Sequence, residues 1–165
     1  MEVSDGDRPT RSSSPITRLF ARASRINTRL DIHRDGANGP VKEKKEDVKK
    51  TLDSDVVTSH DTIMGDMAVS YVVVKKEMNL APLLKGLPND QCQARHWGYV
   101  LKGSFEVDYG GHKETCKQGD FFYMPPGHVP RASPGTEIIQ FTPRDENEKI
   151  VAAMTKNMAS MGGAR

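Results

Sequence analysis

The sequence contains little cysteine, few aromatic residues and no long hydrophobic run. Its 165 residues include two cysteines, Cys92 and Cys116, which are too few for a disulfide scaffold and fit a reducing compartment. No apolar run approaches the roughly 18 residues that a membrane-spanning helix needs, so we expect no transmembrane segment. Acidic residues occupy the place of a basic secretory leader (Glu2, Asp5 and Asp7). These absences predict a cytoplasmic protein.

The net charge of +2 is unevenly distributed along the chain. Residues 1–50 carry twelve Lys and Arg against eight Asp and Glu, a net charge of +4, whereas residues 51–165 carry twelve against fourteen, a net charge of −2. The later part shows neither a basic stripe nor interleaved aromatic residues, so we expect no nucleic-acid partner. It also lacks a phosphate-binding loop, which argues against a nucleotide cofactor.

Residues 11–30 contain no acidic residue and place apolar side chains at helical spacing, with arginines on the opposite face. Three interpretations stay open: a mitochondrial-type presequence, a helix that binds a membrane surface or a partner, and a disordered extension with an accidental pattern. The acidic start and the marginal stability of short isolated helices favour disorder. A mitochondrial location therefore remains the alternative to the cytoplasm.

Short segments rich in β-forming residues dominate the later part of the chain. Strands are predicted within 63–74 and at 93–101, 104–109, 112–116, 121–124 and 137–142, separated by turns that contain glycine or proline. Residues 78–90 are predicted to form a loop that covers part of the structure. Many short strands with such turns are typical of an all-β antiparallel sandwich or barrel.

The chain ends with a helical pattern. Asp145 and Glu146 can cap a helix, and the apolar residues that follow share one face (Ile150, Val151, Met154 and Met158). We expect this helix to pack on the outside of the barrel or on a partner subunit. The predicted organisation is a basic, mostly disordered extension and charged linker over 1–54, a barrel over 55–143, and a helix and tail over 144–165.

Two motifs resemble those of the cupin family. Gly119, five residues, Pro125, one residue and Gly127 match the second cupin motif, and GYVLKG at 98–103 resembles the end of the first. The segments PLLKGLP, CQARHWGYVLKG and PPGH are similar to small single-domain cupins of the cupin-2, RmlC-like type. This resemblance covers residues 65–143. It implies a jelly-roll β-barrel with a pocket in its mouth.

The metal motif departs from the family pattern. In metal-binding cupins the first motif supplies two histidines and a glutamate, and counting back from its last glycine puts Asp90, Cys92 and His96 in those three places. The second motif normally supplies a histidine where this chain has Pro130, and His128 lies two residues earlier. The usual set of three histidines and one glutamate is therefore absent.

A replacement metal site is nevertheless plausible on geometric grounds. Asp90, Cys92 and His96 share parity, so on an extended strand they face the same side, which in the cupin arrangement is the barrel interior. A cysteine thiolate with two imidazoles suits zinc or another borderline metal, with Asp90 as an oxygen ligand. We therefore keep Asp90, Cys92, His96 and His128 as candidate ligands of a divalent ion of the zinc or iron class. The alternative is hydrogen-bonded histidines, a core cysteine and a turn-forming aspartate.

The pocket is predicted to be lined by Cys92, His96, His128, Tyr99 and Tyr123. We favour a protein that binds a small molecule there without chemistry. One alternative is a metal-dependent cupin enzyme of the dioxygenase, isomerase or lyase type, with an atypical ligand set. Another is a non-catalytic scaffold for dimerisation or interaction, whose basic tail contacts a partner. A homodimer is expected.

Overall fold

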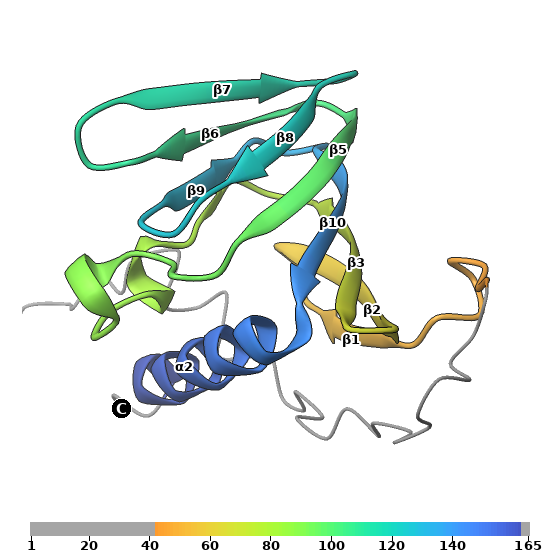
Figure 1. The fold of residues 1–165 in the computed structure, drawn as a ribbon, viewed down its shortest axis with the longest axis horizontal. Helices are drawn as coiled ribbons and strands as arrows, with labels where there is room; N and C mark the ends of the chain where they lie inside the picture. Colours follow the sequence, from red (N-terminus) through yellow and green to blue (C-terminus); the bar gives the residue numbers. More distant parts are fainter. Residues whose placement is uncertain (1–41, 163–165) are drawn as a thin grey trace, which may run out of the picture.

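The computed structural model describes residues 42–162, which form two antiparallel β-sheets and one long helix (Figure 1). The elements in chain order are β1 (Lys50–Asp53), β2 (Val57–Met64), β3 (Met67–Val74), β4 (Met78–Asn79), the 3-10 turns η1 (Ala81–Leu83) and η2 (Pro88–Asp90), β5 (His96–Lys102), β6 (Ser104–Asp108), β7 (Lys113–Lys117), β8 (Phe121–Met124), β9 (Val129–Ala132), β10 (Glu137–Pro143) and α2 (Arg144–Gly162). The predicted all-β fold with a C-terminal helix is confirmed. The candidate helix at 11–30 lies outside the described residues.

The two sheets enclose the core between them. One has six strands in the order β1-β2-β3-β10-β5-β8, and the other has four in the order β4-β9-β6-β7. Their inner faces meet in a single apolar cluster, to which the six-stranded sheet contributes Val74, Val100, Phe122 and Met124 and the four-stranded sheet Phe105, Val107 and Ala132. Burial of this cluster is the main driving force for the packing of the sheets.

Alternation along β5 determines what faces the core. His96, Gly98 and Val100 are buried, whereas the residues between them point to the outer face. Gly98 leaves room for a neighbouring aromatic ring, because a Cβ atom there would lie 2.3 Å from the Phe122 Cζ atom and 2.3 Å from the Ile139 carbonyl oxygen. The strand thus places His96 on the inner surface. Two residues later, Gly98 leaves the space that the Phe122 ring occupies.

The strands β1, β4 and β9, and most of β2, fall where the sequence predicted none. β1 lies inside the predicted charged linker, where its Leu52 pairs with Ser59 of β2 and lines the interior. A single inward leucine in a run of charges gives too weak a signal for a strand. β9 contains Pro130, which normally argues against a strand, yet this residue lies opposite Val107 in β6.

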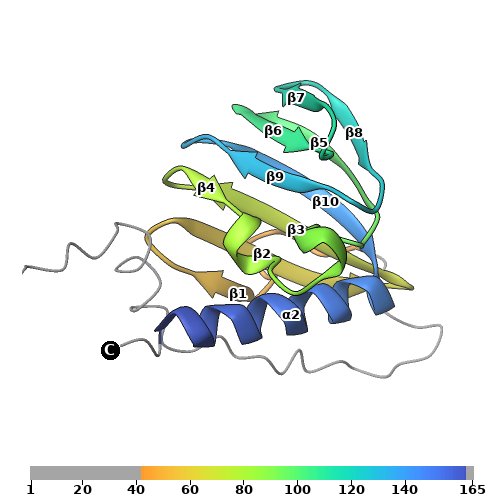
Figure 2. The same ribbon diagram turned by 90° about the vertical axis from the view of Figure 1, so that its left-hand side faces the viewer.

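The helix α2 packs against η1 and contacts β10 and β3. It lies along one side of the sheets, next to β1 and β2 in the view of Figure 2. Asn157 fixes it there by donating hydrogen bonds of 2.8 Å to the carbonyl oxygens of Leu83 and Lys85. Its Ile150 is buried with Leu84. Within residues 42–162, no helix is long and apolar enough to cross a membrane.

Candidate metal centre and ligand pocket

A cavity of about 640 Å³ lies between the sheets and α2. Its wall is largely apolar and includes Val72 and Ile138 from the six-stranded sheet, Phe105 and Ala132 from the four-stranded sheet, and Ile150, Met154 and Met158 from α2. This volume is typical of sites that take a small molecule. Cys92, His96 and His128 form part of the same wall.

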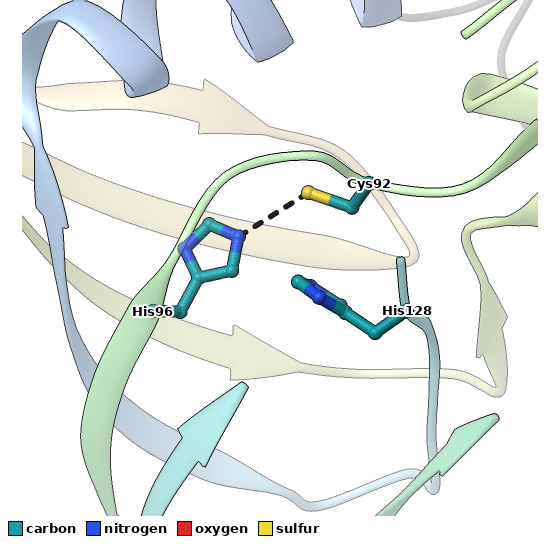
Figure 3. A group of neighbouring side chains, drawn as sticks. All are labelled: Cys92, His96 and His128. Atoms are coloured by element: carbon teal, nitrogen blue, oxygen red, sulfur yellow. Dashed lines mark hydrogen bonds between the residues drawn. The ribbon is translucent and has the colours of Figure 1, made fainter. Parts of the chain in front are cut away.

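Backbone hydrogen bonds bring these three side chains together from separate segments (Figure 3). Cys92 follows η2 and forms an isolated β-bridge with His128, in which the Cys92 N–H donates to the His128 carbonyl oxygen at 2.8 Å. The Gly127 N–H donates back to the Cys92 carbonyl oxygen at 2.7 Å, from a backbone with φ of 94° that favours glycine. His96 is the first residue of β5 and points inward.

The potential ligand atoms of the three residues all lie within 4.8 Å of one another. The Cys92 Sγ and His96 Nε2 atoms are 3.4 Å apart. The ring centroids of His96 and His128 are 5.1 Å apart, and the two ring planes form an angle of 79°. Zinc binds thiolate sulfur at ~2.3 Å and imidazole nitrogen at ~2.0–2.1 Å, so tetrahedral coordination places these atoms roughly 3.5 Å apart. The Cys92 and His96 atoms already have this spacing, and the other pairs, which lie within 4.8 Å, would have to close by about 1 Å around an ion.

The tautomer of His128 follows from its surroundings. Its Nδ1 atom lies 2.6 Å from the Pro125 carbonyl oxygen. Because a carbonyl can only accept, Nδ1 must carry the proton, and Nε2 of the neutral ring has a free lone pair. Among the described residues, this Nε2 is the one buried side-chain nitrogen or oxygen without a hydrogen-bond partner. An unsatisfied buried atom costs about 1–3 kcal/mol, so a hydrogen-bond donor or a cation at this position would relieve that cost.

His96 is also held through Nδ1, here by a hydroxyl that can donate or accept. Its Nδ1 atom lies 2.7 Å from the Oγ1 atom of Thr142, a residue of β10 that is only 1% exposed. Its other nitrogen, Nε2, faces the Cys92 sulfur. Metal-binding histidines characteristically make such a bond through the nitrogen that does not bind the metal. Thr142 and the Pro125 carbonyl thus hold both rings through Nδ1, which leaves the Nε2 side of each ring toward the cluster.

Burial keeps the cluster uncharged. It lowers the pKa of His96 to about 3, with a smaller contribution from the neighbouring His128, and it lowers the pKa of His128 as well. It also raises the pKa of the Cys92 thiol to about 11. Neutral imidazoles can bind a metal directly, whereas the thiol must lose its proton to do so. The side chains of Cys92, His96 and His128 are therefore uncharged when no cation is bound.

Three of the predicted site residues lie elsewhere. Asp90 is exposed in the turn η2, where its carboxylate accepts a 2.8 Å hydrogen bond from the Gly86 N–H. The chain there is a turn and not an extended strand, so shared parity with Cys92 does not bring the two side chains together. Tyr99 and Tyr123 lie on the outer face of the sheet and do not line the cavity.

Sequence reasoning missed both Thr142 and the contribution of α2 to the pocket. A signal existed for the threonine, because the even positions of β10 share the inner face with His96 once β10 and β5 are paired. The apolar face of the helix was identified correctly, but the sequence alone does not reveal which surface it covers. That surface is the cavity.

Comparison with known proteins finds one matching family model and several similar solved structures. Residues 89–136 match the model of the Cupin domain family. Among curated proteins, none matches the sequence. An RmlC-like cupin from Shewanella frigidimarina is similar over 66% of this chain and 96% of its own, with 18% identity and a TM-score of 0.48. The EutQ protein of Clostridium difficile is similar over 64% of this chain and 82% of its own, with 17% identity and a TM-score of 0.41.

An oxalate decarboxylase variant from Bacillus subtilis is also similar, over 66% of this chain but 30% of its own, with 18% identity and a TM-score of 0.46. The matched family segment runs from η2 to the residue before β10 and contains Cys92, His96 and His128. The match to the Cupin domain family is confined to this segment of the chain.

Proposed function

We propose that this cupin binds a small, largely apolar molecule in its cavity, beside a divalent ion of the zinc class held by Cys92, His96 and His128. The observation that carries the proposal is the Nε2 atom of His128, which is buried, carries a lone pair and has no partner among the described residues. A cation gives this atom a partner. The sulfur of Cys92 and the Nε2 of His96 lie within reach of the same ion.

The donor set supports the choice of metal. One thiolate and two imidazoles suit a borderline metal such as zinc, and three protein ligands leave one position open, as in catalytic zinc sites. A zinc ion bound there supplies Lewis-acid polarisation of a ligand oxygen or of a water molecule. Thr142 and the Pro125 carbonyl orient the imidazoles, and the apolar wall excludes bulk water. Metal-dependent catalysis on a bound molecule is the second candidate function, and the open position favours it.

The composition of the wall suggests the class of ligand. Apolar side chains dominate, Ser59, Asn79 and Gln140 supply neutral polar groups, and Lys76 and Glu77 are the charged residues of the lining. A molecule with an apolar body and one or two polar groups fits such a wall.

Metal analysis of the intact protein tests the metal site. We expect about one zinc-class ion per chain in the wild type and in Cys116→Ser, whose cysteine lies outside the cluster. The ion should be lost in Cys92→Ser, His96→Ala and His128→Ala. A wild type that takes up no divalent ion when zinc is added, or variants that retain it, would contradict the proposal.

An apolar fluorescent dye tests the cavity separately. Ile138 lines the cavity, whereas its neighbour Ile139 pairs with Tyr99 on the outer side of the same strand. We expect Ile138→Phe to fill space and weaken dye binding severalfold, and Ile139→Phe to leave it unchanged. Equal effects of the two variants would show that the dye does not bind in the cavity.

A further inference from the structure

The inner face of β2 carries a carboxylate that neither the metal cluster nor the apolar core uses. Alternate residues of this strand point inward, and Val57 and Ser59 line the cavity. Asp61 is the next residue on that face and is partly buried. Strand pairing places Ser70 of β3 beside it, with Gln140 of β10 beyond. The carboxylate therefore lies next to the cavity wall.

Three hydroxyl groups converge on Asp61. The Ser59 Oγ atom donates to Oδ1 at 2.9 Å, and the Thr51 hydroxyl donates to Oδ2. Burial raises the pKa of Asp61, whereas hydrogen bonds from Ser70 and Ser59 act in the opposite direction. Within residues 42–162, Asp61 forms no ion pair with a lysine, arginine or histidine. The carboxylate is therefore stabilised by hydroxyl donors, each of which directs its proton toward it.

This arrangement determines what Ser59 offers to the cavity. A serine hydroxyl has one proton and two lone pairs, and it ordinarily rotates to suit its partner. Here the proton is directed to Asp61, which as a carboxylate can only accept. The lone pairs of the Ser59 oxygen are left for a molecule in the cavity, whose wall includes this residue. Toward the cavity, Ser59 is thus an acceptor and not a donor.

Ser59 lies far from the metal cluster. Across the inner face it is followed by Val72 of β3 and Ile138 of β10. The row then reaches β5, the strand that begins with His96. Neighbouring strands are about 4.8 Å apart, so three spacings separate Ser59 from β5 by roughly 14 Å along the sheet. Val72 and Ile138 line the cavity between the two ends, so an apolar stretch of wall separates two polar groups.

We propose that Ser59, positioned by Asp61, is a second binding site of the cavity, at which the ligand donates a hydrogen bond from a terminal hydroxyl group or another neutral donor. The inference rests on the proposed function, because it requires a molecule in the cavity. Such a ligand is elongated, with an apolar body that lies along Val72 and Ile138. A molecule that ends in an ether or ester oxygen is disfavoured, because two acceptors that face each other both lack a partner.

Displacement of the apolar dye from the intact, zinc-loaded protein tests this site with two probes of the same size. The alcohol n-octanol ends in a hydroxyl donor, whereas heptyl methyl ether carries only an acceptor oxygen. With zinc bound, the lone pair of His128 is occupied, and either oxygen can bind to the ion. We expect the alcohol to bind about 5–10-fold more tightly than the ether, as one hydrogen bond predicts. Ser59→Ala should remove this preference, and Ser59→Thr should keep it.

Asp61→Asn tests the positioning role. The amide keeps the size of the side chain but can donate to Ser59, which frees the serine proton for an ether oxygen. The ratio of the two affinities should therefore fall toward one. Thr58→Val is the matched control, because Thr58 lies on the other face of β2 and does not line the cavity. Its ratio should equal that of the wild type. If thermal melting shows that Asp61→Asn does not fold, the two Ser59 variants decide the question.

The outcomes separate this site from the cavity as a whole. Equal displacement by alcohol and ether in the wild type overturns the second site but not the cavity. A preference that survives Ser59→Ala and is lost in His128→Ala assigns the donor contact to the metal cluster and also overturns it. An unchanged ratio in Asp61→Asn refutes the positioning role. Displacement by neither probe overturns the cavity proposal together with this site. Because His128→Ala lacks the metal site, its comparison holds even if the metal proposal fails.

Discussion

His128 shows how one backbone acceptor determines the chemistry of a side chain. The Pro125 carbonyl takes the Nδ1 proton, and the lone pair of the neutral imidazole is left on the buried Nε2. Without a cation, this atom contributes an unfavourable desolvation term to folding. A residue that lowers the stability of the empty protein and gains a partner on binding is characteristic of a functional site.

Thr142 is a positioning residue for His96. Thr142→Val keeps the size of the side chain and removes the oxygen that binds Nδ1, so we expect zinc affinity to fall about 10–100-fold while the stoichiometry at saturation stays the same. Thr142→Ser should restore most of the affinity. Competition with a chromophoric chelator measures both variants. An unchanged affinity in Thr142→Val would show that this hydrogen bond does not orient the ligand.

The buried cluster also predicts how the stability of the metal-free protein depends on pH. In the unfolded chain His96 binds a proton near its ordinary pKa of 6.5, whereas in the folded chain its pKa is about 3, so the free energy of unfolding falls as pH drops from 6.5 toward 3. The Cys92 thiol has a pKa of 9.0 when unfolded and about 11 when folded, so stability also falls as pH rises through that interval. The free energy of unfolding should therefore be highest between about pH 6.5 and pH 9.

Thermal melting of the chelator-treated protein across pH measures this dependence. His96→Gln should flatten the acid side, because one pKa unit corresponds to about 1.4 kcal/mol. His112→Gln changes an exposed histidine and should not affect it. If the stability of His96→Gln fell as steeply with decreasing pH as that of the wild type, the lowered pKa of His96 would not be the cause of the acid dependence.

Parity predicted some site residues and misplaced others. It placed His96 inside the barrel and Trp97 outside, as the structure has them. The same rule puts Tyr99 with Trp97, so its assignment to the pocket was inconsistent with the placement of His96. Parity fails for Asp90 because η2 is a turn, in which alternate residues do not share a side. The misplacement of Asp90 thus arises from local backbone conformation, which residue types alone indicate weakly.

At the scale of elements, turn chemistry was more informative than strand composition. The strand β8 was predicted with the observed bounds because glycine and proline mark both of its ends. β1 was missed because its single inward leucine lies in a charged run, and β9 because of Pro130. Long-range pairing, which the sequence does not display, stabilises both strands.

Gly98 provides a test of the packing of β5. A methyl group there meets both the Phe122 ring and the Ile139 carbonyl oxygen, and the second is backbone that cannot turn away. We expect Gly98→Ala to lower the free energy of unfolding by about 1–3 kcal/mol or more. Gly111→Ala is the matched control, because a Cβ atom at that position would have nothing within 4 Å. Urea unfolding midpoints compare the two, and equal midpoints would contradict the close approach.

The helix α2 closes the cavity and is fixed by few polar contacts. Asn157→Ala removes the two hydrogen bonds to the carbonyl oxygens of Leu83 and Lys85. Each is worth about 1 kcal/mol, so exchange of the α2 amides should become roughly 5–30-fold faster. Hydrogen exchange measured by mass spectrometry should show this change in α2 but not in β5. The exposed neighbour Lys156→Ala is the control, and a uniform change over the whole chain would argue against a local opening.

For the molecule as a whole, the metal cluster and the cavity form a single unit. Cys92 packs with Ile150 of α2 in one apolar cluster, while His96 starts β5 and His128 precedes β9. A cation held by the three therefore ties the two sheets together and stabilises the folded state by mass action. The sequence motifs contain Cys92, His96 and His128, but only the fold defines how these three side chains approach one another.

The X-ray absorption spectrum of the zinc-loaded protein tests the central claim most directly. We predict a first shell with one sulfur at ~2.3 Å and two imidazole nitrogens at ~2.0–2.1 Å, together with a light-atom ligand in the position that the protein leaves open. The sulfur contribution should disappear in Cys92→Ser and persist in Cys116→Ser. A first shell of nitrogen and oxygen alone in the wild type would contradict the proposed Cys92, His96 and His128 site.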